Sequence, residues 1–563
     1  MRHLTASALI LALSFGGQIH KAEAQIVNRD TSAGAYLAAR HALNESNYRV
    51  AANYLDQLLA LDRTNGDLAI NAILSHAALG DWSRAAEIST TIKDDNPSRE
   101  LADLAILVDL LQRGDVEAAF TRIRAERGAG LLVDDLIAGW LYLAQGQMDL
   151  ASDSFNGLAG DQGLADLAYY HLALARGAVG DFEGAAQIYE GVEFNLGAAG
   201  SRILRAYAQT LVQLDRADDA VAMLDGVLSQ NRDLSLAALR DEIATNPTRS
   251  YDFVVTPQQG LAEVFFTLAE ALGRESGPTL PLIYARAAYH IDPNHLEAAL
   301  LSGDLLVETG QFELAVEIYG AVPADHPLAL EATIGRSDAF ARTGRSDEAI
   351  TTLQDLIAAE PQPFAVHAQL GDLLRREERF TEAAAAYSQA VELIDQEDPR
   401  FWFLFYARGI CYEQTDEWDA AEADFRKALR LSPDQASVLN YLGYSLVEQR
   451  RNLDEALTMI ERAVALEPES GYIVDSLAWV YFRLGRYQEA VAPMERAVEL
   501  LPTDPIVNDH LGDVYWKVGR QREARFQWER ALSFEPTEED AERIRLKLEL
   551  GLDAVQQREV EGK

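Results

Sequence analysis

Apolar residues recur at spacings of three and four along most of the chain, in segments that come in pairs. Residues 471–504 show the pattern: the first apolar face consists of Leu477, Ala478 and Tyr481, and the second of Ala490, Met494 and Ala497. These spacings predict two amphipathic helices that pack through one seam. Gly485 lies where the first helix must turn, and Pro502 follows the second, where it cannot continue helical hydrogen bonding. The segment is therefore predicted to be a helical hairpin.

The hairpin pattern repeats with a nearly constant period. Pro327 and Pro361 lie 34 residues apart, and the steps from Pro433 to Pro468, Pro502 and Pro536 are 35, 34 and 34. A period in this range predicts stacked repeats in which each unit buries its neighbour's face. The better-kept repeats begin near Ala262, Leu296, Leu330, Phe364, Trp402, Ala436, Gly471 and Pro505.

Upstream of residue 245 the pattern is weaker but persists. Gly80 and Gly114 lie 34 residues apart, as do Gly146 and Gly180. We therefore predict an all-α fold, a tandem helix-turn-helix superhelix or α-solenoid of about fourteen repeats.

The predicted domain organisation follows from where the period holds and where it breaks. Asn246-Pro247 and Pro257 interrupt the helical spacing. The predicted parts are a degenerate N-terminal array at 31–234, a helix and irregular joint at 235–261, a C-terminal array at 262–536, and a capping helix and tail at 537–563. A cap is expected because the last repeat of an array exposes a face that its neighbours would otherwise cover.

Residues 1–24 have the pattern of a secretory signal peptide: Arg2, an apolar stretch from Leu4 to Phe15, and the cleavage-like triplet Ala22-Glu23-Ala24. The other interpretation is an ordinary buried first helix. The apolar stretch is too short to span a bilayer, so we expect no transmembrane segment. No cysteine stands directly after this apolar stretch, where a lipoprotein would carry its lipid. This predicts an exported soluble protein and not a lipoprotein.

The formal net charge of −40 argues against nucleic acid as a partner, because a polyanion requires a basic surface. The acidity is typical of a large solvated surface, and it would also suit a basic partner. Cys411 is the only cysteine, which excludes an intramolecular disulfide and a cysteine metal cage. His290 and His295 flank Pro293 in a poor chelating arrangement. We predict no catalytic residues, no metal and no cofactor, since repeats occupy nearly the whole chain.

The chain resembles the tetratricopeptide repeat family from about residue 262 onward. The family's marked positions are filled by Leu511, Gly512, Tyr515, Gly519, Ala524, Trp528, Ala531 and Pro536 in the last repeat, and by Gly409, Tyr412, Trp418, Ala421, Phe425, Ala428 and Pro433 in an earlier one. The segments 439–444, 475–479 and 508–513 are similar to an exported subgroup of Gram-negative bacteria. That subgroup includes an outer-membrane lipoprotein that acts as adaptor for a periplasmic carboxyl-terminal processing protease. The resemblance implies a periplasmic location.

In this family, positions 2, 5, 6, 9, 12 and 13 of each first helix line a concave binding face. In the last three repeats the resemblance assigns to this face Asn440, Tyr441, Tyr444, Tyr472, Asp475, Ser476, Trp479, Phe482, Asp509, His510, Asp513 and Trp516. Aromatic side chains edged by carboxylates suit a peptide with apolar and basic side chains. A plainer interpretation is that these side chains only pack on one another. The family's carboxylate clamp is not reproduced, because Asp475, Asp509 and Asp513 stand where cations are required.

We therefore expect a non-catalytic periplasmic scaffold that binds peptide or protein segments, with protease adaptor as its most specific form. One alternative is a structural component of a cell-envelope assembly or export machine, in which the outer surface matters. Another is an enzyme accessory with an activity of its own, for which the chain has no separate domain.

Overall fold

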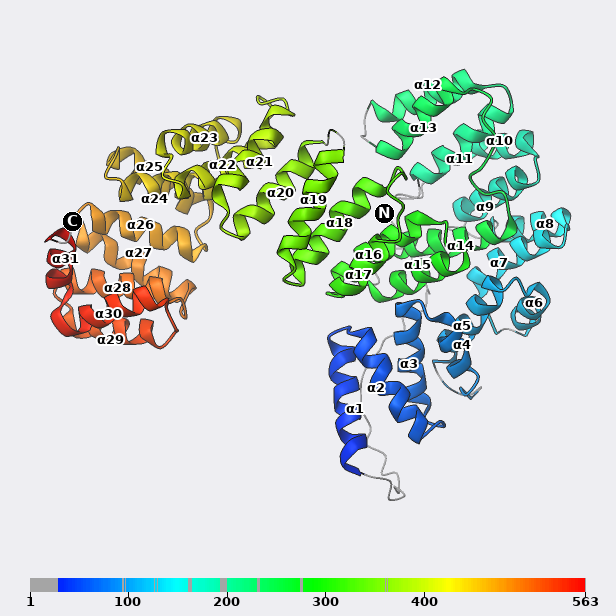
Figure 1. Ribbon diagram of the computed structural model, residues 1–563, viewed down its shortest axis with the longest axis horizontal. Coiled ribbons are helices and arrows are strands. Elements are labelled where there is room, and N and C mark those ends of the chain that lie inside the picture. Colours follow the sequence, from blue (N-terminus) through cyan, green and yellow to red (C-terminus); the bar gives the residue numbers. More distant parts are fainter. Residues whose placement is uncertain are drawn as a thin grey trace. The chain divides into compact units, whose positions relative to one another are not determined.

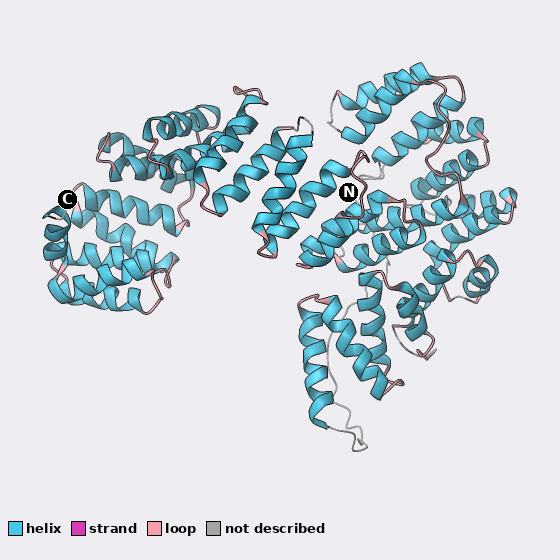
Figure 2. Cartoon of the chain, in the orientation of Figure 1, coloured by secondary structure: helices cyan, strands magenta, loops and turns pink. Residues whose placement is uncertain are grey.

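The computed structural model describes residues 29–561, apart from short gaps at 94–95, 97, 126, 129, 160–164, 193–199, 230–232, 274–276, 360 and 362. The predicted signal peptide at 1–24 lies outside the described residues. Figure 2 shows helices joined by short loops, and the described residues contain no strand. The predicted all-α repeat fold is confirmed.

The chain forms two compact units, residues 1–336 and 337–563, and the boundary falls within α18 (Ala329–Arg342). Figure 1 labels the helices of both units in chain order. The helices of the first unit that precede α18 are α1 (Arg29–Asn44), α2 (Tyr48–Leu61), α3 (Gly66–Leu79), α4 (Trp82–Ser89), α5 (Arg99–Gln112), α6 (Val116–Arg124), α7 (Leu131–Ala144), α8 (Met148–Ala159), α9 (Ala165–Ala178), α10 (Phe182–Gly191), α11 (Gly200–Gln213), α12 (Ala217–Leu228), α13 (Leu234–Thr245), α14 (Pro257–Leu272), α15 (Thr279–Ile291), α16 (Leu296–Glu308) and α17 (Phe312–Tyr319).

The second unit continues the hairpin series to the C-terminal end. Its helices after α18 are α19 (Ser346–Ala359), α20 (Phe364–Arg376), α21 (Phe380–Glu392), the short 3₁₀ helix η3 (Pro399–Phe401), α22 (Trp402–Gln414), α23 (Trp418–Leu431), α24 (Ala436–Glu448), α25 (Leu453–Leu466), α26 (Gly471–Arg483), α27 (Tyr487–Leu500), α28 (Pro505–Lys517), α29 (Gln521–Leu532), α30 (Glu538–Leu550) and α31 (Leu552–Glu561). The segment 537–563, for which a capping helix and tail are predicted, contains two helices, which meet at Gly551.

The hairpin of α26 and α27 forms as its sequence predicts. The turn residue Gly485 has a φ of 75°, in the left-handed region where glycine lacks the Cβ penalty of other residues. Its amide donates to Phe482 O at 3.0 Å, and the amide of Arg486 donates to Tyr481 O at 2.9 Å, which satisfies the last carbonyls of α26. The seam residues with fully buried side chains are Ala478, Ala490, Met494 and Ala497.

Helix α14 begins at Pro257, inside the stretch that the sequence pattern assigns to the joint. The Thr256 side chain accepts from the Gln259 amide, the Gln259 side chain accepts from the Thr256 amide, and Pro257 supplies a favourable first helical residue. This capping box explains why the helix starts earlier than the repeat spacing suggests. The predicted division into two arrays stays a prediction.

Helices α14 and α15 lie against helices far from them in the sequence. Helix α14 contacts α5, α7 and α9, and α15 contacts α3 and α5. Figure 1 shows α14 and α15 in green, α3 and α5 in blue, and α7 and α9 in shades of cyan. A Cβ on Gly260 would come within 2.2 Å of the Trp140 ring, so α14 and α7 approach closely. Because these contacts tie residues 257–291 to the N-terminal helices, the first compact unit extends beyond the predicted joint.

Candidate functional site

The predicted binding residues lie on the first helices of three consecutive hairpins, α24, α26 and α28. Helix α26 contacts both α24 and α28 directly. A spacing of 34 or 35 residues therefore brings equivalent positions of these helices side by side. We call these positions, together with the same positions of α22, the first-helix face.

On α24, the three predicted residues Asn440, Tyr441 and Tyr444 are half-buried. The Tyr441 hydroxyl donates to Glu413 Oε2 at 3.2 Å, and its ring meets Tyr406 edge-on with centroids 5.9 Å apart. Tyr406 and Glu413 belong to α22, so aromatic contact continues from one first helix to the next. The same repeat positions, followed one hairpin further back, would have identified both residues from the sequence.

On α26, the predicted residues differ widely in exposure. Tyr472 is 61% exposed, whereas Phe482 is 5% and Ser476 is 6% exposed. The Ser476 hydroxyl donates to the Tyr472 carbonyl at 2.9 Å, within its own helix. Tyr472 is therefore available to a ligand, while Ser476 and Phe482 serve mainly the packing of the array.

Trp479, also on α26, joins two neighbouring helices. Its indole Nε1 donates to Glu448 Oε1 at 2.9 Å, and its ring stacks on His510 with centroids 4.0 Å apart. His510 in turn donates from Nδ1 to Asp475 Oδ1 at 3.0 Å. Burial alone would lower the pKa of His510, but the Asp475 carboxylate raises it above its usual value. Asp475 and His510 are thus a buried pair that supports the half-exposed Trp479 ring.

On α28, the two predicted carboxylates are buried and occupied by the chain itself. The Lys547 ammonium of α30 lies 2.7 Å from Asp509 Oδ2 and 2.7 Å from Asp513 Oδ2. Arg543 also donates to Asp509, at 3.2 Å, and Trp528 Nε1 donates to Asp513 Oδ1 at 3.0 Å. Trp516 Nε1 donates to an Asp553 oxygen of α31 at 2.9 Å. Sequence reasoning missed Lys547, because it lies outside the repeat period.

In the first unit, a buried ion cluster surrounds Glu263, a residue of α14. The other members come from outside this helix. Arg202 Nε donates to Glu263 Oε1 at 2.8 Å, and so does the Tyr170 hydroxyl at 2.8 Å. His295 Nδ1 accepts the Ala298 amide, so its Nε2 donates to Glu263 Oε2 at 3.1 Å. Burial alone would raise the pKa of Glu263, but Arg202 and His295 lower it well below its usual value. Glu263 is thus an anion held inside the first unit.

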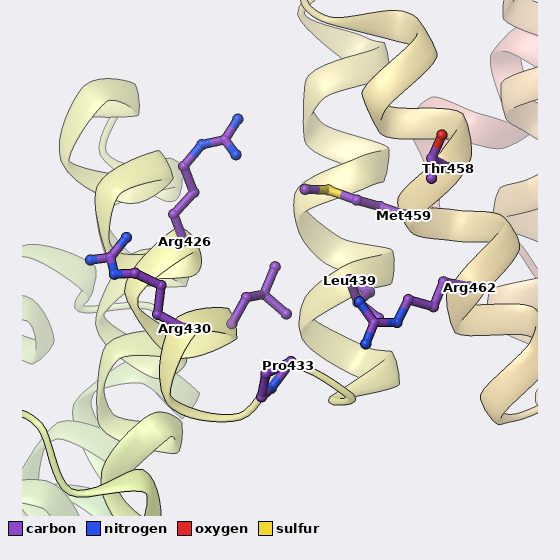
Figure 3. A pocket seen from close by; sticks show the side chains of 8 residues that line it. Arg426, Arg430, Pro433, Leu439, Thr458, Met459 and Arg462 are labelled. Atoms are coloured by element: carbon purple, nitrogen blue, oxygen red, sulfur yellow. The ribbon is translucent and has the colours of Figure 1, made fainter.

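One hollow in the second unit lies between the second helices α23 and α25, beside Leu439 of α24. It encloses about 360 Å³, and Figure 3 shows Met459 and Leu439 within it and Arg426, Arg430 and Arg462 around it. Most of this positive charge is neutralised. Arg426 pairs with Glu422 and Glu455, and Arg462 pairs with Asp434.

In the described ranges, no three or more His, Cys, Asp or Glu side chains gather in a way that could hold a metal ion. Cys411 is buried, and burial raises the pKa of its thiol to about 11, so it is not a reactive thiolate at neutral pH. His295 serves the Glu263 cluster, and His290 contacts the Trp82 ring with centroids 6.3 Å apart. These three residues have structural roles.

The stacked helical hairpins define a helical-repeat protein. The family model of a tetratricopeptide repeat matches residues 36–100, and that of the C-terminal domain of cilia and flagella-associated protein 70 matches residues 267–547. The chain is a tetratricopeptide repeat protein.

Known relatives match parts of the chain. TPR repeat-containing protein PA4667 of Pseudomonas aeruginosa is 28% identical over 186 residues, which are 33% of this chain and 30% of that protein. The Lipoprotein NlpI homolog of Haemophilus influenzae is 34% identical over 85 residues, 15% of this chain and 26% of that protein. The chain thus matches less than a third of either relative. A solved structure of the APC/C hetero-tetramer Cut9-Hcn1 is 16% identical, covers 93% of this chain and 97% of that chain, and has a TM-score of 0.38. Within residues 29–561, none of the described helices is long and apolar enough to cross a membrane.

Proposed function

We propose that this protein is a non-catalytic scaffold that binds peptide or protein segments on the first-helix face of its second unit. Tetratricopeptide arrays are protein-interaction scaffolds, and the observation that carries the proposal is the exposure of this face. Tyr472 is 61% exposed, and Tyr441, Tyr444 and Trp479 on the same face are half-buried. Large aromatic side chains at such positions are common anchors of protein partners.

In the first unit, α14 covers part of the corresponding surface, on α9 and α11. Glu263 and Thr267 of α14 form hydrogen bonds with side chains of α9 and α11. These side chains are Tyr170, His171 and Arg202. The first-helix positions of the second unit between α22 and α26 are therefore the better candidate for an external ligand.

The proposed location is the periplasm, and the most specific proposed role is an adaptor for a periplasmic protease. Support for export comes from the signal-peptide pattern of residues 1–24. The partial similarity to a bacterial lipoprotein is consistent with the subgroup that suggested the adaptor role.

The proposal predicts that aromatic truncation on the first-helix face weakens partner binding. A Tyr472→Ala, Trp479→Ala chain is expected to lose about 2 kcal/mol of affinity per residue, or roughly 30-fold each, for partners captured from periplasmic extract. The measurement is quantitative affinity capture followed by titration of the recovered partner. Trp516 is a poorer probe, because its indole also binds Asp553 of the cap.

Phe526→Ala is the matched control, because Phe526 of the second helix α29 is also 61% exposed. This variant should recover partners as the unmodified chain does. If a folded Tyr472→Ala, Trp479→Ala chain recovers every partner in full, the first-helix face is not the binding surface.

A second candidate is a structural component of an envelope assembly that works through its outer surface. The hollow between α23 and α25 favours it, because Arg430 is exposed there and makes no ion pair with any described residue. In that case Arg430→Glu, and not the Tyr472 variant, would reduce partner recovery.

A further inference from the structure

The C-terminal helices bind the first-helix face through charged groups. Lys547 of α30 is only 3% exposed, and its two partners Asp509 and Asp513 are 0% and 3% exposed. Arg543, one helical turn before Lys547, reaches Asp509 as well. Because residues four apart share one face of a helix, α30 presents a basic pair to this acidic pair.

The contacts of the next helix extend this arrangement along the same face. Asp553 of α31 accepts from Trp516 and is paired with Lys517, both of α28. Asp509, Asp513, Trp516 and Lys517 stand at positions 5, 9, 12 and 13 of their repeat. The chain's own C-terminal segment therefore lies where the face of this repeat would hold a ligand.

The acidic pair requires a cation whatever covers it. Burial raises the pKa of Asp513 to about 6, although Lys547 lowers it. The carboxylate is therefore ionised at neutral pH, but its burial makes the ionised form less stable than it would be in water. Two carboxylates left buried without a positive partner would be strongly unfavourable. Any helix that buries these carboxylates again in place of α30 must accordingly bring a positive charge of its own.

The apolar part of the attachment is a short row of side chains from both helices. Helix α30 contributes Ala541 and Ile544 as buried apolar side chains, and α31 contributes Leu552 and Val555, while Leu546 and Leu550 are exposed. The ion pairs supply much of the specificity with which α30 and α31 attach to α28. A competing helix with the same charges can form the same ion pairs.

We propose that α30 and α31 are an intramolecular ligand of Asp509 and Asp513, and that a partner helix with two basic residues four positions apart replaces them. The inference rests on the proposed function, since it defines the chemistry of the partner at one end of the first-helix face. It also makes binding there conditional on release of the C-terminal segment.

The test uses the full chain and a fluorescent synthetic peptide with the sequence of residues 537–556. A Lys547→Glu substitution in the chain should release α30 by placing a carboxylate beside Asp509 and Asp513. Fluorescence anisotropy should then show the peptide binding about tenfold more tightly to this variant than to the unmodified chain, because the site is no longer occupied. A peptide with glutamate in place of Lys547 should bind neither protein.

Arg545→Glu is the matched control, since Arg545 lies on α30 but is exposed and pairs with Glu538. This variant should bind the peptide as weakly as the unmodified chain does. Asp553→Ala is a milder release variant, to be used if Lys547→Glu does not fold, and it should also tighten peptide binding.

Unchanged peptide affinity in the folded release variants would overturn the inference. In that event, undiminished partner capture through Tyr472 and Trp479 would leave the proposed function standing. Loss of that capture in the Tyr472→Ala, Trp479→Ala chain would support the proposed function independently of α30.

Discussion

Replacement of Arg202 with methionine is expected to destabilise α14 and its contacts by about 4 kcal/mol. Glu263 is completely buried, and the substitution removes the guanidinium that neutralises it. Tyr170 and His295 would still donate to the carboxylate, but they do not replace the lost permanent charge. Hydrogen exchange of the α14 amides in the full chain measures the effect, because protection there should fall by about three orders of magnitude, or about 4 kcal/mol.

Two further variants identify the cause. Addition of Glu263→Gln to Arg202→Met removes the unpaired charge and should restore part of the protection. Arg216→Met removes a half-exposed arginine that pairs with Glu190 and Asp219, and it should leave α14 unchanged. Wild-type protection of α14 in the Arg202→Met chain would show that the buried ion cluster does not hold this helix.

Replacement of Trp528 with alanine is expected to destabilise the C-terminal end of the second unit by about 4 kcal/mol. The indole is completely buried, and Gly512 leaves room for it: a Cβ at that position would lie 2.3 Å from Trp528 Nε1. The substitution leaves a cavity and also removes a hydrogen-bond donor from buried Asp513. Urea denaturation followed by circular dichroism should show an earlier transition for this unit.

Phe526→Ala, in the same helix but 61% exposed at Phe526, should leave that transition in place. Trp528→Phe keeps most of the volume and should show an intermediate loss. A Trp528→Ala chain that unfolds at the same urea concentration as the unmodified chain would contradict the assignment of Trp528 to the core of this repeat.

The hairpins themselves could be predicted from the sequence, because their determinants are local. Apolar spacing identified the seam of α26 and α27, and glycine identified the turn at Gly485. The equivalent turns after α20, α22 and α24 also have positive φ, but there Glu378, Asp416 and Arg450 adopt it. Glycine is therefore not required at this turn, since stacking of the repeats stabilises the conformation for other residues too.

The sequence did not predict that α14 covers α9 and α11, or that α30 covers α28. The contacts that hold these helices in place do not follow the repeat period. Tyr170 and Glu263 are 93 residues apart, and Lys547 and Asp509 are 38 apart. The repeat period predicts that each helix packs on its neighbours in the sequence. It does not predict a helix that packs across several repeats. For the same reason, the acidic positions Asp509 and Asp513 could be identified, but their partner Lys547 could not.

The proposed binding face is tested most directly by hydrogen exchange of the full chain with and without a partner recovered by affinity capture. We expect added protection in α22, α24 and α26, around Tyr441, Tyr472 and Trp479, and unchanged exchange in α7 and α9. Protection confined to α23 and α25, or to helices of the first unit, would contradict the claim that the first-helix face of the second unit holds the partner.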